Sequence, residues 1–125
     1  TAVEVPAGKT TVYLSGTVPA VRDKSADAAS TAAYGNMQQQ TESIMEQIKA
    51  QLEGMGMSVG DIIKMQAFLV APDGGKLDFD GFMAGYSKYF GTKEQPNLPV
   101  RSAMAVQALV NPGWLVELEV TAVRP

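Results

Sequence analysis

One arginine stands inside an otherwise apolar segment of this chain. Arg101 follows Pro99-Val100 and precedes a run of small and apolar residues. The other two arginines lie elsewhere, Arg22 in a polar loop and Arg124 at the tail. A guanidinium withdrawn from water needs an anionic partner, which is either a protein carboxylate or an acid group on a ligand. Arg101 is therefore a candidate binding residue, and a structural ion pair is the alternative.

Two carboxylates, Glu117 and Glu119, lie two residues apart in a segment of strand-like alternation. They would share one face of a strand, where like charges repel, and a solvated face is the simplest interpretation. The sharper interpretation is that one of them positions a water molecule for reaction. Ser15-Gly16, at the end of a predicted strand, forms either a plain turn or a place where backbone N–H groups approach a ligand.

Composition limits the available chemistry. The 125-residue chain has no histidine, no cysteine and a net charge of −3. The lack of cysteine excludes disulfides and thiolate nucleophiles, and the lack of histidine excludes the commonest general base and the commonest metal ligand. We therefore predict no metal site. Basic residues are scattered rather than gathered into a stripe, so nucleic acid is not an expected partner. No apolar run approaches the ~20 residues that span a bilayer, so no membrane partner is expected.

Length predicts a single domain over residues 1–125. Because the chain opens on Thr1 rather than Met, we expect a processed or trimmed product. We expect a cytoplasmic location, and a periplasmic one stays open if a targeting segment was removed before Thr1.

Hydrophobic periodicity predicts five strands and two helices in the order ββαβαββ. Residues 3–5 and 10–15 read as a hairpin, and the last strands, 100–109 and 115–123, as another. A long amphipathic helix over about 35–55 and a shorter one from Asp78 or Asp80 flank a strand over 62–70, which we expect to be buried on both faces. The helices should cover one face of a single sheet, an α+β architecture. We assign to the core the aromatic stripe and three methionines, namely Phe79, Phe82, Tyr86, Phe90, Met37, Met45 and Met55.

In the predicted C-terminal hairpin, Glu117 would face about Val106, roughly 17 Å along the strand from Arg101 at ~3.3 Å per residue. The two groups then serve separate purposes or meet across a subunit interface. The far face of the sheet would carry Ala103 and Ala105 beside them, and such a half-apolar face favours oligomerisation.

Six segments in order resemble the Rid/YjgF family of reactive-intermediate (enamine/imine) deaminases, also labelled endoribonuclease L-PSP, and the resemblance covers about Val3 to Val123. They are Tyr13–Pro19, Gln40-Thr41, Gly56–Ile62, Tyr86–Phe90, Pro99–Ser102 and Leu115–Ala122. The resemblance implies a chorismate-mutase-like fold and a homotrimer with clefts between subunits.

The resemblance also implies roles for residues. Arg101 would grip a substrate carboxylate, Glu117 would hold the attacking water, and Ser15 and Gly16 would line the pocket. Two wall positions depart from the family, because Ala103 replaces a usual cysteine and Met83 replaces an asparagine. A tyrosine usual in the family would lie before Thr1.

These roles imply hydrolysis of small 2-imino or enamine acids, such as 2-aminoacrylate, to 2-keto acids and ammonia, without a cofactor. A non-catalytic module that binds a 2-keto acid or similar carboxylate metabolite is the alternative. RNA cleavage, the family's other label, is disfavoured by the acidic charge and the lack of histidine.

Overall fold

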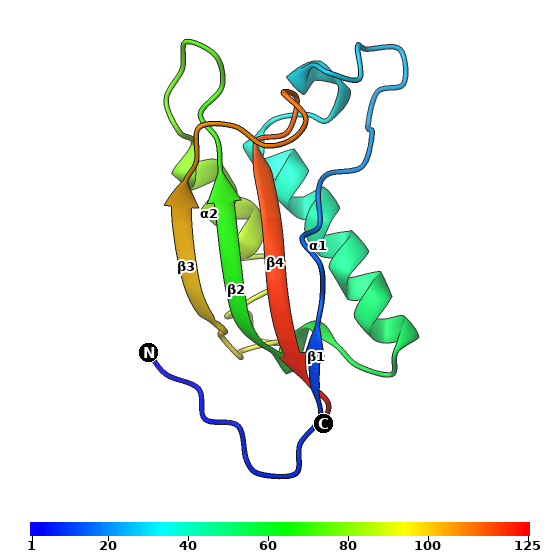
Figure 1. The fold of residues 1–125 in the computed structure, drawn as a ribbon, viewed down its shortest axis with the longest axis vertical. Coiled ribbons are helices and arrows are strands. Elements are labelled where there is room, and N and C mark those ends of the chain that lie inside the picture. Colours follow the sequence, from blue (N-terminus) through cyan, green and yellow to red (C-terminus); the bar gives the residue numbers. More distant parts are fainter.

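Two helices pack on one face of a single sheet, as predicted, but the sheet has four strands rather than the predicted five (Figure 1). The computed structural model describes all 125 residues. The elements are β1 (Thr11–Tyr13), α1 (Met37–Gly54), β2 (Ile62–Leu69), α2 (Phe79–Tyr86), β3 (Val100–Ala105) and β4 (Val116–Val123), with single 3₁₀ turns at Thr31–Ala33 and Val59–Asp61. No helix combines the length and the hydropathy that crossing a bilayer requires.

The strand order is β1-β4-β2-β3, with β2 and β3 parallel and β4 antiparallel to both of its neighbours. The predicted hairpin of 100–109 with 115–123 is therefore wrong, since β2 lies between β3 and β4 and β3 already ends at Ala105. Helix α2 returns the chain to the start of the sheet, so the next strand runs parallel to β2, as a crossover connection requires.

The predicted N-terminal hairpin is also wrong. Residues 1–10 form no strand and are exposed, and Pro6, which has no backbone N–H, interrupts this segment. Strand β1 pairs instead with the end of β4, where Thr11 faces Val123. A three-residue edge strand offers little backbone for a further strand to pair with.

The helix boundaries follow from local sequence. The Asn36 side chain accepts from the Gln39 N–H at 2.9 Å, and the Gln39 side-chain Oε1 accepts from the Asn36 N–H at 2.9 Å, which forms a reciprocal cap at the start of α1. Gly56, with φ +74°, ends this segment in a left-handed conformation that glycine adopts readily. Asp78 caps α2 by accepting from the Gly81 N–H at 2.9 Å.

The core lies between the sheet and the helices. The β2 residues that face the helices are buried, whereas those on the other face are partly covered or, at Lys64, exposed, so the predicted burial on both faces is wrong. The core predictions hold for most of the aromatic stripe and for Met37 and Met45. They fail for Met55 and Phe79, which are 36% and 41% exposed. Met55 lies beyond the last turn of α1, and Phe79 opens α2 at its outer end.

Candidate functional site

Arg101 lies on the helix side of the sheet, at the outer strand β3. Its Cζ is 4.6 Å from the centre of the Tyr86 ring, 5.4 Å from that of Phe82 and 5.9 Å from that of Phe79. Its Nη1 donates to Met83 Sδ at 3.1 Å. All four partners belong to α2, so three aromatic faces and a thioether hold the guanidinium.

No carboxylate pairs with Arg101. The one ion pair in the chain joins Lys88 Nζ to Glu42 Oε1 at 2.9 Å. Thioether sulfur is a weak acceptor and ring faces accept no conventional hydrogen bond, so most guanidinium donors remain available to an anion. The structural alternative, an ion pair of Arg101 with Glu117 or Glu119, is therefore absent within this chain.

Two hollows adjoin Arg101. One, of about 370 Å³, is bounded by the end of α2 and by Leu98-Pro99. The other, of about 380 Å³, is bounded by Lys64, Met65, Val100 and Ser102. Arg101 lines both, which makes it the cationic element of a concave surface.

Glu117 belongs to a second cluster of residues. Residues 14–17 run along β4 beyond β1, with the Thr17 N–H donating to the Leu118 carbonyl at 2.8 Å and the Leu118 N–H to the Thr17 carbonyl at 3.1 Å. This pairing brings Gly16 against the Glu117 side chain so closely that a Cβ on Gly16 would overlap Glu117 Oε2. Ser15 is exposed beside it. The structure thus brings together Ser15, Gly16 and Glu117.

Arg101 and Glu117 do not meet in one chain. Arg101 is in register with Met65, and Glu117 with Phe68, on opposite edges of β2. This register separates them by about 10 Å across the sheet and about 10 Å along it. They also lie on opposite faces, since Met65 is buried under the helices whereas the Glu117 side chain alternates with buried Leu118.

The prediction that one far face carries Arg101, Ala103 and Ala105 with Glu117 is therefore wrong. The assumed hairpin does not explain this error, because a Glu117 that faces Val106 already lies on the opposite face from Arg101 by strand alternation. Ala103 is in register with buried Ala67, so it points to the helix side with Arg101. The predicted site residues accordingly form two groups, Arg101 with Met83 and Ala103, and Glu117 with Ser15 and Gly16.

Burial raises the pKa of the Tyr86 phenol, and the charge of nearby Arg101 offsets part of that rise. Tyr86 therefore stays neutral at physiological pH and presents an uncharged ring face to the guanidinium. Sequence reasoning assigned this ring and Phe82 to the core alone. The signal that could have identified them is their helical spacing with Met83, which puts all three on one stripe of α2.

Gln40 belongs to one of the six segments that resemble the family, but sequence reasoning gave it no structural role. Its buried side chain donates to the carbonyls of Gly35 at 2.9 Å and Gly113 at 3.0 Å, and accepts from the Leu115 N–H at 2.7 Å. These bonds fix the segment that immediately precedes β4. They therefore position the strand that carries Glu117.

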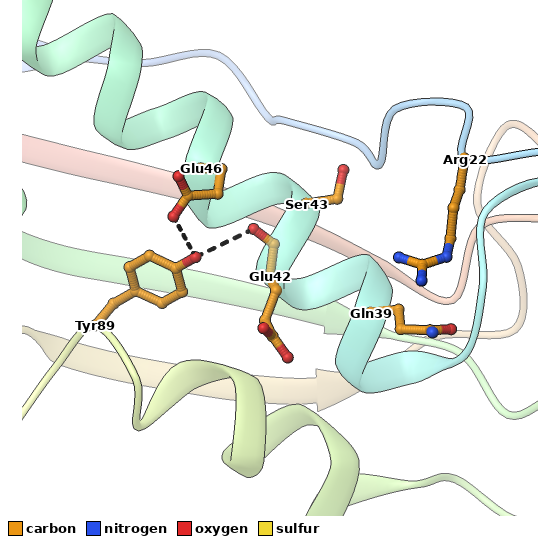
Figure 2. A pocket seen from close by; sticks show the side chains of 6 residues that line it. All are labelled: Arg22, Gln39, Glu42, Ser43, Glu46 and Tyr89. Atoms are coloured by element: carbon orange, nitrogen blue, oxygen red, sulfur yellow. Dashed lines mark hydrogen bonds between the residues drawn. The ribbon is translucent and has the colours of Figure 1, made fainter.

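A larger hollow, of about 450 Å³, lies on the outer side of α1 (Figure 2). Two acidic side chains face it, and the Tyr89 hydroxyl donates to Glu46 Oε2 at 2.5 Å. The hydrogen bond from Lys88 lowers the pKa of Glu42, so that carboxylate stays charged near neutral pH. Arg22 is the only cation in the lining, so this hollow suits an anionic ligand less well than the Arg101 surface. No group of three acidic side chains is placed to hold a metal ion.

Comparison with known proteins assigns the family. The model of the family described as Endoribonuclease L-PSP matches residues 3–124. A RutC family protein of Pyrococcus horikoshii is 33% identical over 90 residues, which are 72% of this chain and 64% of that protein. The matched segment thus spans less than two thirds of this curated relative.

Solved structures of similar proteins agree with this family assignment. The crystal structure of E. coli TdcF with bound serine superposes with a TM-score of 0.72 at 30% identity, covering 97% of this chain and 85% of that one. The YjgF gene product of E. coli gives a TM-score of 0.72 at 27% identity with the same coverage. These likenesses confirm the predicted fold class, and the chain belongs to the L-PSP endoribonuclease family, to which YjgF and its relatives also belong.

Proposed function

We propose that this protein hydrolyses small reactive 2-imino acids and their enamine tautomers to 2-keto acids and ammonium, in clefts between protomers. The observation that carries the proposal is a partly buried arginine with no carboxylate partner, held by ring faces beside two hollows. A planar carboxylate can form two parallel charge-assisted hydrogen bonds with such a guanidinium. The serine bound by TdcF is likewise a small carboxylate, which supports this class of ligand here.

The division of the site residues into two groups supports an assembly. Arg101 and Glu117 lie on opposite faces of one sheet, so a ligand between them requires Glu117 of a neighbouring copy. The open face also carries partly covered Phe68 and Met104 and an 80% exposed Tyr13, as expected of a surface that another copy covers. We propose a closed ring, and a homotrimer as in the family resemblance.

The reaction uses water alone. The substrate carboxylate docks on Arg101, and Glu117 of the adjacent protomer accepts a proton from a water that attacks the imine carbon. An enamine first takes a proton on carbon to become the protonated imine, and addition of water to that imine gives a neutral carbinolamine whose amino group takes the proton held by Glu117. The C–N bond then breaks and its electron pair leaves with ammonia, while an oxygen lone pair forms the keto C=O bond. The released ammonia takes the proton lost by the hydroxyl group. The products are a 2-keto acid and ammonium. Imines are electrophilic already, so positioning and base assistance are sufficient.

Ammonium release from 2-aminoacrylate generated in solution tests the proposal. We expect Arg101→Ala and Glu117→Gln each to lower the enzyme-dependent rate by at least about 100-fold. Matched controls are Arg22→Ala and Glu53→Gln, which remove an exposed charge of the same type away from both groups of site residues. Full activity in Arg101→Ala would contradict the assignment.

A binding module without turnover is the second candidate. Ala103 brings no polar side-chain group to the Arg101 side of the sheet, and Met83 brings only a weak acceptor. Calorimetry with 2-ketobutyrate, run beside the ammonium assay, separates the two candidates. Tight binding without ammonium release identifies the module.

A further inference from the structure

The hollow between α2 and the start of β3 combines one cation with apolar walls. Arg101 supplies its only charged side chain, and Met83, Phe90, Leu98 and Pro99 line it together with the Tyr86 ring. Two polar residues, Thr1 and Ser87, complete the lining. A ligand that matches these walls has one anionic group and an apolar remainder.

The second hollow at Arg101 differs in character. It is lined by Lys64 and Ser102 as well as by apolar residues, so it offers a second cation and a hydroxyl. Arg101 lines both hollows, so a ligand whose carboxylate binds the guanidinium can place its apolar substituent in the first hollow and its polar atoms in the second. The apolar hollow, at about 370 Å³, has the size that suits a small metabolite.

Met83 contacts both the guanidinium of Arg101 and the apolar hollow. Its sulfur accepts from Arg101 Nη1, and its side chain also forms part of the apolar wall. A carboxylate outcompetes a thioether for a guanidinium donor, so a bound substrate would release Met83. The flexible, polarisable side chain can then pack against the substituent of the ligand.

We infer that the preferred substrates are 2-imino acids with an apolar side chain of about the size of leucine's, and that Met83 determines this preference. The inference rests on the proposed function for the chemistry, and on the hollow alone for the side chain. Burying additional methylene groups improves binding by at least about tenfold over a ligand that has only a methyl group.

Calorimetry measures this preference independently of turnover. We expect 4-methyl-2-oxopentanoate to bind at least about tenfold tighter than pyruvate, with a more negative heat-capacity change. Met83→Gln, of similar length but polar, should reduce this affinity ratio below about threefold, whereas Met83→Leu should retain it. Leu98→Ser is a second variant, because Leu98 is 58% exposed and its replacement does not threaten folding.

Turnover of imines made in solution from leucine and from alanine completes the design. Preference for the leucine product in both assays, reduced by Met83→Gln or Leu98→Ser, supports the inference. Equal or tighter pyruvate binding overturns it, even if imines are hydrolysed. A preference that survives both polar substitutions also overturns the role of this wall. If no imine is hydrolysed while the binding preference holds, the proposed function fails and the specificity of the hollow stands.

Discussion

Replacing Gly16 with alanine tests the contact that places the Glu117 carboxylate. A Cβ on Gly16 would overlap Glu117 Oε2 and come within 3.0 Å of its Cδ. The oxygen would have to move by roughly 1 Å, and a misplacement of that size costs about 100-fold in rate when it affects a reacting group. Because the carboxylate is the free end of a flexible side chain, we expect the free energy of unfolding to change by less than about 1 kcal/mol.

The assay is ammonium release from 2-aminoacrylate, and the design is a double-mutant cycle. If the added methyl group acts through Glu117, Gly16→Ala in a Glu117→Gln background should cause little further loss. Gly54→Ala is the matched control, since a Cβ at Gly54 meets nothing within 4 Å. Urea denaturation of each variant reports the free energy of unfolding separately from the rate.

Two results would refute this reasoning. Wild-type rates in Gly16→Ala would mean that the position of the carboxylate does not matter. Losses that add fully in the double variant would mean that Gly16 acts independently of Glu117, for instance through its own backbone.

Three further predictions concern stability. Gln40→Met leaves the carbonyls of Gly35 and Gly113 and the Leu115 N–H without their hydrogen-bond partner, so urea denaturation should show a free energy of unfolding lower by about 3 kcal/mol. The control Gln51→Met, at an exposed position, should lose almost none. Equal losses in the two variants would contradict this. Gly85→Ala puts a Cβ 3.0 Å from Thr41 Cβ where α2 packs on α1, so we expect the free energy of unfolding to fall by about 1–3 kcal/mol and the melting temperature to fall with it. An unchanged melting temperature would show that the helices separate easily. Burial and the hydrogen bond to Glu46 raise the pKa of Tyr89 above its ordinary value of 10.0, so the neutral phenol's contribution to folding stability is complete below that pH and is lost as the pH rises further. The free energy of unfolding of Tyr89→Phe should therefore fall less steeply above pH 10 than that of the wild type. Parallel curves for the two proteins would contradict this.

The helices and the last strand were predictable because their signals are local. Asn36 and Gly56 delimit α1, and the alternation from Val116 to Val123 gives β4 and its buried face directly. Strand neighbours were not predictable in this way. The assumption that consecutive strands pair gave a hairpin, whereas the α2 crossover puts β3 on the far edge of β2.

The same distinction holds at the site. The type and isolation of Arg101 were visible in the sequence, and so was the candidate role of Glu117. Which face each occupies depends on register, and register depends on pairing across β2. The inference that the two groups do not meet within one chain holds in the observed topology, although the distance behind it came from the wrong pairing.

A shared site predicts complementation between two inactive variants. In a closed ring assembled from equal amounts of Arg101→Ala and Glu117→Gln chains, about a quarter of the interfaces combine an intact arginine with an intact glutamate. Co-refolded mixtures should therefore recover about a quarter of the wild-type ammonium release, while each parent refolded alone stays inactive. A mixture that assembles normally and yet remains as inactive as its parents would contradict a site built between protomers.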